Sequence, residues 1–144
     1  MKLLLSALAV VAVCSQAMAD AASDLFSVPK SNKMDLQSPL GVWEVGPFVI
    51  DNVSYTMRFR IGQNQVTAGN KCTANNQSAM VAITVPSTLT PNTLTMDGSD
   101  SQAVTQNGVN CNISTTAGSV EQYSISNGLM TLSDSPLKAL KISD

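Results

Sequence analysis

Few side chains in this sequence are of a type that does chemistry, and none of them forms a recognisable catalytic group. The chain has no histidine, so it lacks the commonest general base, the commonest metal ligand and the usual activator of a serine or cysteine nucleophile. None of its acidic residues falls into a paired motif with a partner base, and most sit at expected turns, where aspartate is a turn former. The run Asp97-Gly98-Ser99-Asp100 lacks the spacing and the terminal glutamate of a calcium loop, and no phosphate-binding glycine loop is present. We therefore expect no catalytic, cofactor-binding or metal-binding residue, and we do not expect an enzyme.

The charge balance limits the partners. Charged residues make up 12% of the 144 residues, about half the usual share of a soluble domain. The formal net charge is −2 and the pI is about 4.8, so the chain has no basic footprint for nucleic acid or an acidic membrane. We expect no nucleic-acid partner, which leaves a small hydrophobic ligand or an envelope or protein partner.

Residues 1–19 have the pattern of a secretory signal peptide. Lys2 supplies the positive charge, residues 3–13 are apolar but too few to span a bilayer as a helix, and Ala17 and Ala19 are the small residues that a signal peptidase requires. Cleavage before Asp20 would release an exported protein, periplasmic or secreted, with no transmembrane segment. Lipidation at Cys14 is not expected, because the branched Val13 stands where a lipoprotein box has a small residue.

Cys72 and Cys111 are the cysteines that remain after such a cleavage. In an oxidising compartment a lone pair is most often a disulfide, which here would close a loop of about 40 residues. Two free thiols or a redox pair are the alternatives, but the two cysteines lack CxxC spacing and no histidine is present to activate them. We expect the disulfide.

Residues 40–144 predict a single all-β domain. Residues 20–39, which include Pro29 and Pro39, are expected to be a leader or linker that either docks on the domain or tethers it. Beyond them, turn signals such as Asn107-Gly108 and Asn127-Gly128 separate short runs that alternate apolar and polar residues. About eight to ten strands at this spacing indicate a barrel or a sandwich. After the strand that begins near residue 40, the expected strands are 53–61, 65–73, 78–85, 93–96, 102–105, 109–115, 120–126, 129–132 and 138–142.

The strand 53–61 carries the candidate ligand-binding residues. Its strict alternation predicts one buried face and one wet or functional face. Tyr55, Met57 and Phe59 on the apolar face belong either to a packed core or to a ligand pocket. Arg58 and Arg60 on the polar face form either a solvated outer surface or an anion contact at a barrel mouth, since arginine forks match carboxylates.

The segment Leu40-Gly41-Val42-Trp43-Glu44 resembles the start of the first strand in lipocalin and calycin barrels. A Gly-x-Trp after an irregular N-terminal stretch, short meandering strands, one disulfide and a late hairpin at 123–132 are together similar to small bacterial lipocalin-like exported domains. The resemblance implies an antiparallel up-and-down barrel of about eight strands, in which Trp43 plugs the closed end and Gly41 allows close strand approach. In that family an arginine near the last strand stacks on the tryptophan, whereas this chain offers Lys138 and Lys141 there. A small β-sandwich is the alternative fold.

Two functions fit these patterns. The first is an exported, non-enzymatic, lipocalin-like barrel that binds a small apolar or amphipathic ligand, for which methionine, a soft residue, suits an adaptable pocket. The second is a periplasmic or secreted envelope or interaction protein with a filled barrel or sandwich, whose Thr/Asn/Ser/Gln-rich loops bind a macromolecular partner. A cavity above about 300 Å³ would favour the first function, and a packed interior would favour the second.

Overall fold

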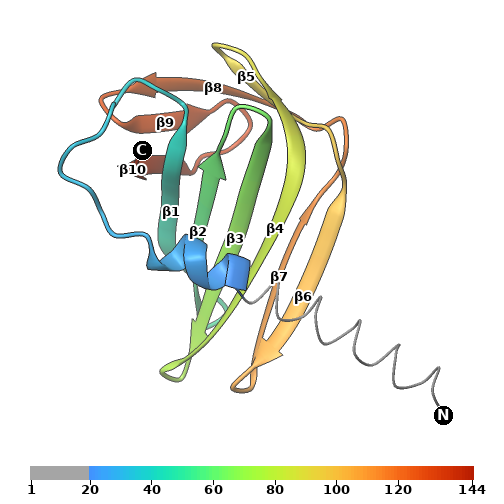
Figure 1. Ribbon diagram of the computed structural model, residues 1–144. Coiled ribbons are helices and arrows are strands. Elements are labelled where there is room, and N and C mark those ends of the chain that lie inside the picture. The colour runs from blue at the N-terminus through green and yellow to red at the C-terminus, as the bar shows by residue number, and fades with distance from the viewer. Residues whose placement is uncertain (1–19) are drawn as a thin grey trace.

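The computed structural model describes residues 20–144, and in them the all-β prediction is confirmed (Figure 1). Eight strands close into an antiparallel barrel, and two more form a separate hairpin. The strands are β1 (Gly41–Ile50), β2 (Val53–Ile61), β3 (Gln65–Ala74), β4 (Gln77–Leu89), β5 (Thr93–Met96), β6 (Asp100–Gln106), β7 (Val109–Thr115), β8 (Val120–Ser126), β9 (Leu129–Leu132) and β10 (Lys138–Ser143).

The ring of strands follows the chain with one interruption. Its order is β1-β10-β9-β8-β5-β4-β3-β2, and β1 closes it by pairing with both β2 and β10. After β5 the chain leaves the ring to form the β6–β7 hairpin, and it returns at β8, which pairs with β5. The barrel is therefore an up-and-down barrel with an inserted hairpin.

Turn chemistry fixes the tight hairpins. Asn107 and Gly108 have φ values of 53° and 76°, and Asn127 and Gly128 have φ values of 49° and 76°. Two consecutive residues with positive φ define the turn whose twist matches that of antiparallel strands, and Asn-Gly is the dipeptide that adopts it at least cost. These turns set the register in which Val109 faces Gln106 and Leu129 faces Ser126.

Trp43 is completely buried and anchors the first of two cores inside the sheet. Its indole Nε1 donates a hydrogen bond to the carbonyl of Pro39 at 2.9 Å. Lys141 of β10 lies with its ammonium 5.7 Å from the centre of the indole ring, the position for which the lipocalin resemblance implies an arginine. The Lys141 side chain is fully buried and its ammonium donates to the carbonyls of Asp35 and Ser38. The coil before β1 is thereby fastened over the tryptophan.

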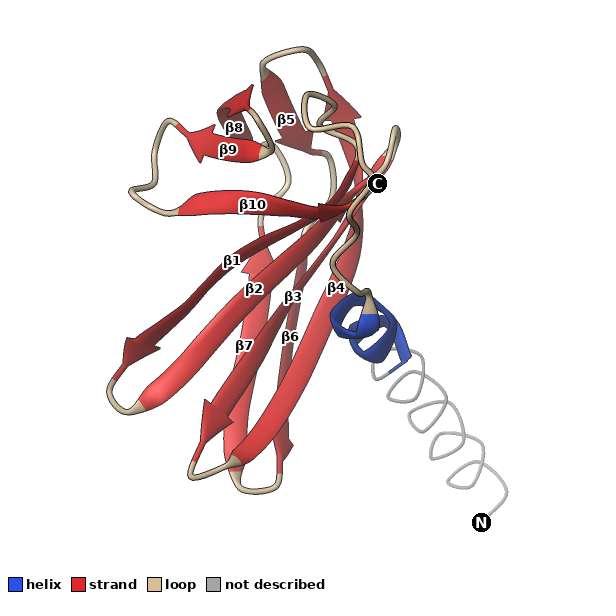
Figure 2. Ribbon diagram, turned by 90° about the vertical axis from the view of Figure 1, so that its left-hand side faces the viewer, coloured by secondary structure: helices blue, strands red, loops and turns tan. Residues whose placement is uncertain are grey.

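A short helix over residues 20–27 lies against the outer face of the sheet (Figure 2). Ala22 and Leu25 are buried there against Val42, Ala82 and Ile142. β3 offers Gly69 to the helix, where an added Cβ would stand only 3.0 Å from the Leu25 side chain. The sequence left two alternatives for the segment 20–39, docking on the domain or a free tether. The structure shows that it is docked.

The second core lies where the β6–β7 hairpin packs over β3 and β4. The hairpin runs alongside the long strands in both views (Figures 1 and 2). Its centre is the disulfide between Cys72 of β3 and Cys111 of β7, whose Cα atoms are 5.7 Å apart, and this confirms the predicted pairing. The Asn70 side-chain amide donates to the carbonyl of Asn112 at 2.7 Å beside it. A disulfide of this kind fits an oxidising compartment.

In residues 20–144 no helix is both long enough and apolar enough to span a membrane. The expected signal peptide at 1–19 and Cys14 lie outside the described residues.

Candidate ligand-binding cavity

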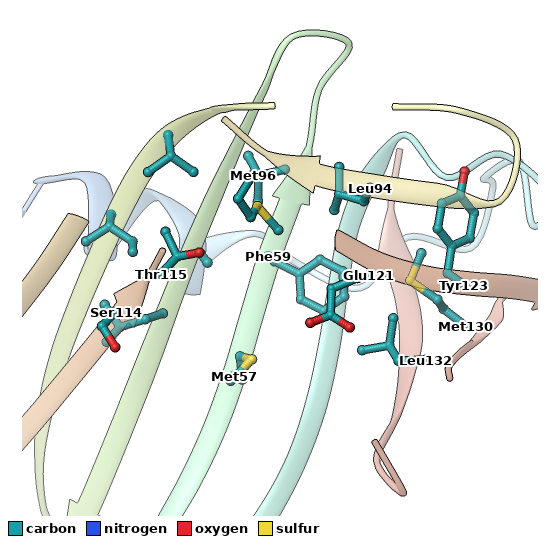
Figure 3. A pocket seen from close by; sticks show the side chains of 15 residues that line it. Met57, Phe59, Leu94, Met96, Ser114, Thr115, Glu121, Tyr123, Met130 and Leu132 are labelled. Carbon is teal, nitrogen blue, oxygen red and sulfur yellow. The ribbon is translucent and has the colours of Figure 1, made fainter. Parts of the chain in front are cut away.

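A partly open cavity of about 240 Å³ lies between the Trp43 core and the disulfide core. Its wall is apolar over most of its area and comes from both the barrel and the inserted hairpin (Figure 3). The lining residues are Met57, Phe59, Val66, Ala68, Ile83, Val85, Leu94, Met96, Ile113, Ser114, Thr115, Glu121, Tyr123, Met130 and Leu132.

Period-two alternation explains how the strands deliver these side chains. Met57 and Phe59 are two residues apart in β2, as are Ile83 and Val85 in β4, so each pair faces the same side of the sheet. Phe59 stands opposite Ala68, whose methyl group is too small to fill the space beside it. The cavity is open space left where small and large residues face one another.

The size of the cavity sets the size of any occupant. At about 240 Å³ it is smaller than the roughly 300 Å³ of pockets that take drug-sized ligands. It is larger than a dry apolar cavity of about 150 Å³, which is already sufficient to bind benzene. If each non-hydrogen atom takes the volume share of a liquid water, about 30 Å³, then about eight such atoms fill it.

Of the predicted ligand-binding residues, Met57 and Phe59 line this cavity, whereas Tyr55 lies outside it. Tyr55 packs against the disulfide core and stacks on Phe48, with the ring centres 5.7 Å apart. The apolar face of β2 therefore lines the cavity at one end of the strand and packs into the disulfide core at the other.

Arg58 and Arg60 lie on the opposite, outer face of β2, and neither lines the cavity. The Arg58 Nε donates to Glu44 at 2.7 Å, and its Nη1 donates to the carbonyls of Leu25, Phe26 and Val28, at 3.2, 3.2 and 2.8 Å. A cation at the end of a helix satisfies carbonyls that have no partner within the helix. Arg58 thus holds the helix over 20–27 on the barrel, and Arg60 is exposed.

The lining includes four polar side chains, those of Ser114, Thr115, Glu121 and Tyr123, and the last two come from β8. Tyr123 is buried and its hydroxyl donates to the carbonyl of Thr90 at 2.5 Å, while burial raises the pKa of the phenol. Glu121 lies two residues earlier in β8 and faces the same space. Glu121 is not among the residues predicted from the sequence to bind a ligand, although the alternation of the 120–126 strand points it to the same side as Tyr123.

A second hollow, of about 310 Å³, lies over β8 and β9 and is polar. It is lined by Asn92, Gln122, Tyr123, Ser124, Thr131 and Ser133. Gln122, Ser124 and Thr131 alternate with the inward residues of β8 and β9, so this part of the hollow lies on the outer side of the barrel. In the described part of the chain no three His, Cys, Asp or Glu residues come close enough to hold a metal ion.

Comparison with known proteins found no matching family model, no matching curated protein and no matching solved structure. The chain has in common with lipocalin-like barrels a closed antiparallel ring of eight strands.

Proposed function

We propose that this protein is an exported, non-enzymatic binding protein that holds a small apolar or amphipathic molecule inside its barrel. The apolar cavity of about 240 Å³ is the observation that supports this function: it falls short of the roughly 300 Å³ set for the first function, but it is not the packed interior expected for the second. Apolar walls gain affinity by removing apolar ligand surface from water, at about 25 cal/mol per Å². The lining methionines, Met57, Met96 and Met130, can change rotamer to fit ligands of different shape. An apolar ligand in this cavity would supply dispersion contacts that its lining side chains lack on the side that faces the open space.

Isothermal titration calorimetry with hexan-1-ol tests the proposal. Its about seven non-hydrogen atoms match the cavity, and at about 0.6 kcal/mol per atom, between the usual bounds for ligands, the Kd is about 1 mM. Ala68→Leu places a larger side chain in the cavity and should weaken this binding at least tenfold. Lys71→Leu adds the same side chain at an exposed position of the same strand and should leave the affinity unchanged. Equal affinity in both variants, or no binding at all, would refute ligand binding in the barrel.

A second candidate function, binding of a macromolecular partner through loops, is favoured by one surface feature. Val49 and Ile50 at the β1–β2 turn are 68% and 54% exposed. Exposed apolar side chains at a turn tip are suited to a protein contact. Val49→Ser with Ile50→Ser should then abolish recovery of a partner from an envelope extract, while hexan-1-ol binding stays at the wild-type level.

A further inference from the structure

We propose that Glu121 makes the cavity selective for amphiphiles with a cationic head group, such as a protonated primary amine. This inference rests on the proposed ligand-binding function and names the class of ligand. Glu121 gives the cavity a negative charge, whereas Arg58 and Arg60 would have given it a positive one.

Glu121 is placed by β8 at the wall of the cavity. It pairs in register with Leu94 of β5, and both side chains line the same space. Figure 3 shows the carboxylate pointing into the cavity, in the region that Phe59 and Leu132 also face. The side chain is half-buried, so the carboxylate is partly shielded from water while remaining reachable from outside.

Within residues 20–144 the Glu121 carboxylate has neither a hydrogen bond nor an ion pair. The two ion pairs of this part of the chain join Arg58 to Glu44 and Lys141 to Asp144. Arginine and lysine are absent from the 15 residues that line the cavity. The cavity therefore presents one unneutralised negative group to whatever enters it.

A carboxylate beside apolar side chains is stabilised by a hydrogen-bonding cation and destabilised by a second anion. An alkylammonium ion places its chain among Phe59, Leu94 and Met130 and its three N–H donors toward Glu121. A fatty-acid carboxylate of the same length meets like-charge repulsion there. An alcohol of the same length has the chain but no charge, which makes it the neutral reference.

The test compares three ligands of one chain length, hexan-1-amine, hexan-1-ol and hexanoate, by calorimetry at about pH 7, where the amine and the acid are both charged. We expect hexan-1-amine to bind about tenfold more tightly than hexan-1-ol, and hexanoate to bind more weakly than either. Salt should reduce the preference for the amine, because an ion pair at a partly exposed site is screened.

Glu121→Gln keeps the shape of the side chain and removes its charge. In this variant the amine preference should disappear, while the affinity for hexan-1-ol stays within about twofold of the wild-type value. Asp134→Asn is the matched control, because it removes one negative charge from an exposed residue outside the cavity lining and should leave the preference intact.

The outcomes separate this inference from the function on which it rests. If hexan-1-ol binds but the amine has no advantage, or if the advantage survives in Glu121→Gln, the role of Glu121 is refuted and ligand binding stands. If none of the three ligands binds, the proposed function is refuted and the inference with it.

Discussion

Replacing Cys72 and Cys111 together with alanine should destabilise the protein by about 4 kcal/mol. The bridge has a sequence separation of 39 and so closes a loop of about 40 residues. The chain-entropy relation assigns a loop of this length about 13 cal/mol/K, or about 4 kcal/mol at room temperature. For a domain of about 125 residues the unfolding entropy is about 0.26 kcal/mol/K, so the Tm should fall by about 15 °C.

The assay is urea unfolding followed by circular dichroism, together with scanning calorimetry. Because the bridge restrains the unfolded chain, its removal should also raise the m-value, which reports the surface exposed on unfolding. The wild-type protein in reductant should reproduce the unfolding curve of the double variant. A loss below about 1 kcal/mol with an unchanged m-value would refute the reasoning. Ile113, which lines the cavity, lies in the same strand as Cys111, so the variant should also bind hexan-1-ol more weakly.

Four further predictions follow from single positions. Gly41→Ala should cost about 3 kcal/mol in urea unfolding, because Gly41 has a φ of 122° and its new Cβ would collide with the carbonyl oxygen of Ser143. Lys141→Met should cost about 2 kcal/mol in the same assay, since it leaves the carbonyls of Asp35 and Ser38 without their donor, breaks the ion pair with Asp144 and removes the cation from Trp43. Arg58→Ala should release the helix over 20–27, which limited proteolysis would detect as faster cleavage before β1. Burial raises the pKa of Tyr123, so the folded state keeps the phenol proton to higher pH than the unfolded state. The resulting contribution to the free energy of unfolding is fully present below about pH 10 and is lost as the pH rises through the folded pKa. Ultraviolet titration of the phenolate, together with alkaline unfolding, would show this loss.

Much of the barrel could be predicted because it depends on local signals. Alternation in β2 and β4 and the Asn-Gly turns act over a few residues, and each survives in the structure. The place of the 102–105 strand could not be predicted in the same way. It belongs to β6, which pairs only with β7 and stays outside the ring of strands. The ring excludes β6 because β5 pairs directly with β8, and these two strands are far apart in the chain.

The candidate site was predicted in part, for reasons that the two faces of β2 make clear. Met57 and Phe59 line the cavity because the apolar face of a strand points inward. The sequence does not show that Arg58 would donate hydrogen bonds to the end of a docked helix, because these bonds join residues about thirty positions apart. Glu121 was within reach of sequence reasoning, since a charged residue two positions before a buried tyrosine on a strand faces the same side.

The most direct test of ligand binding in the barrel is a titration with hexan-1-ol that follows the carbon-13 labelled methionine methyl groups by NMR. Met57, Met96 and Met130 line the cavity, whereas Met80 packs against the outer helix and Met34 lies in the coil before β1. The three lining methyl signals should shift and saturate with a single Kd, while those of Met34 and Met80 stay in place. Unmoved lining signals, or equal shifts at all of these methionines, would contradict ligand binding inside the barrel.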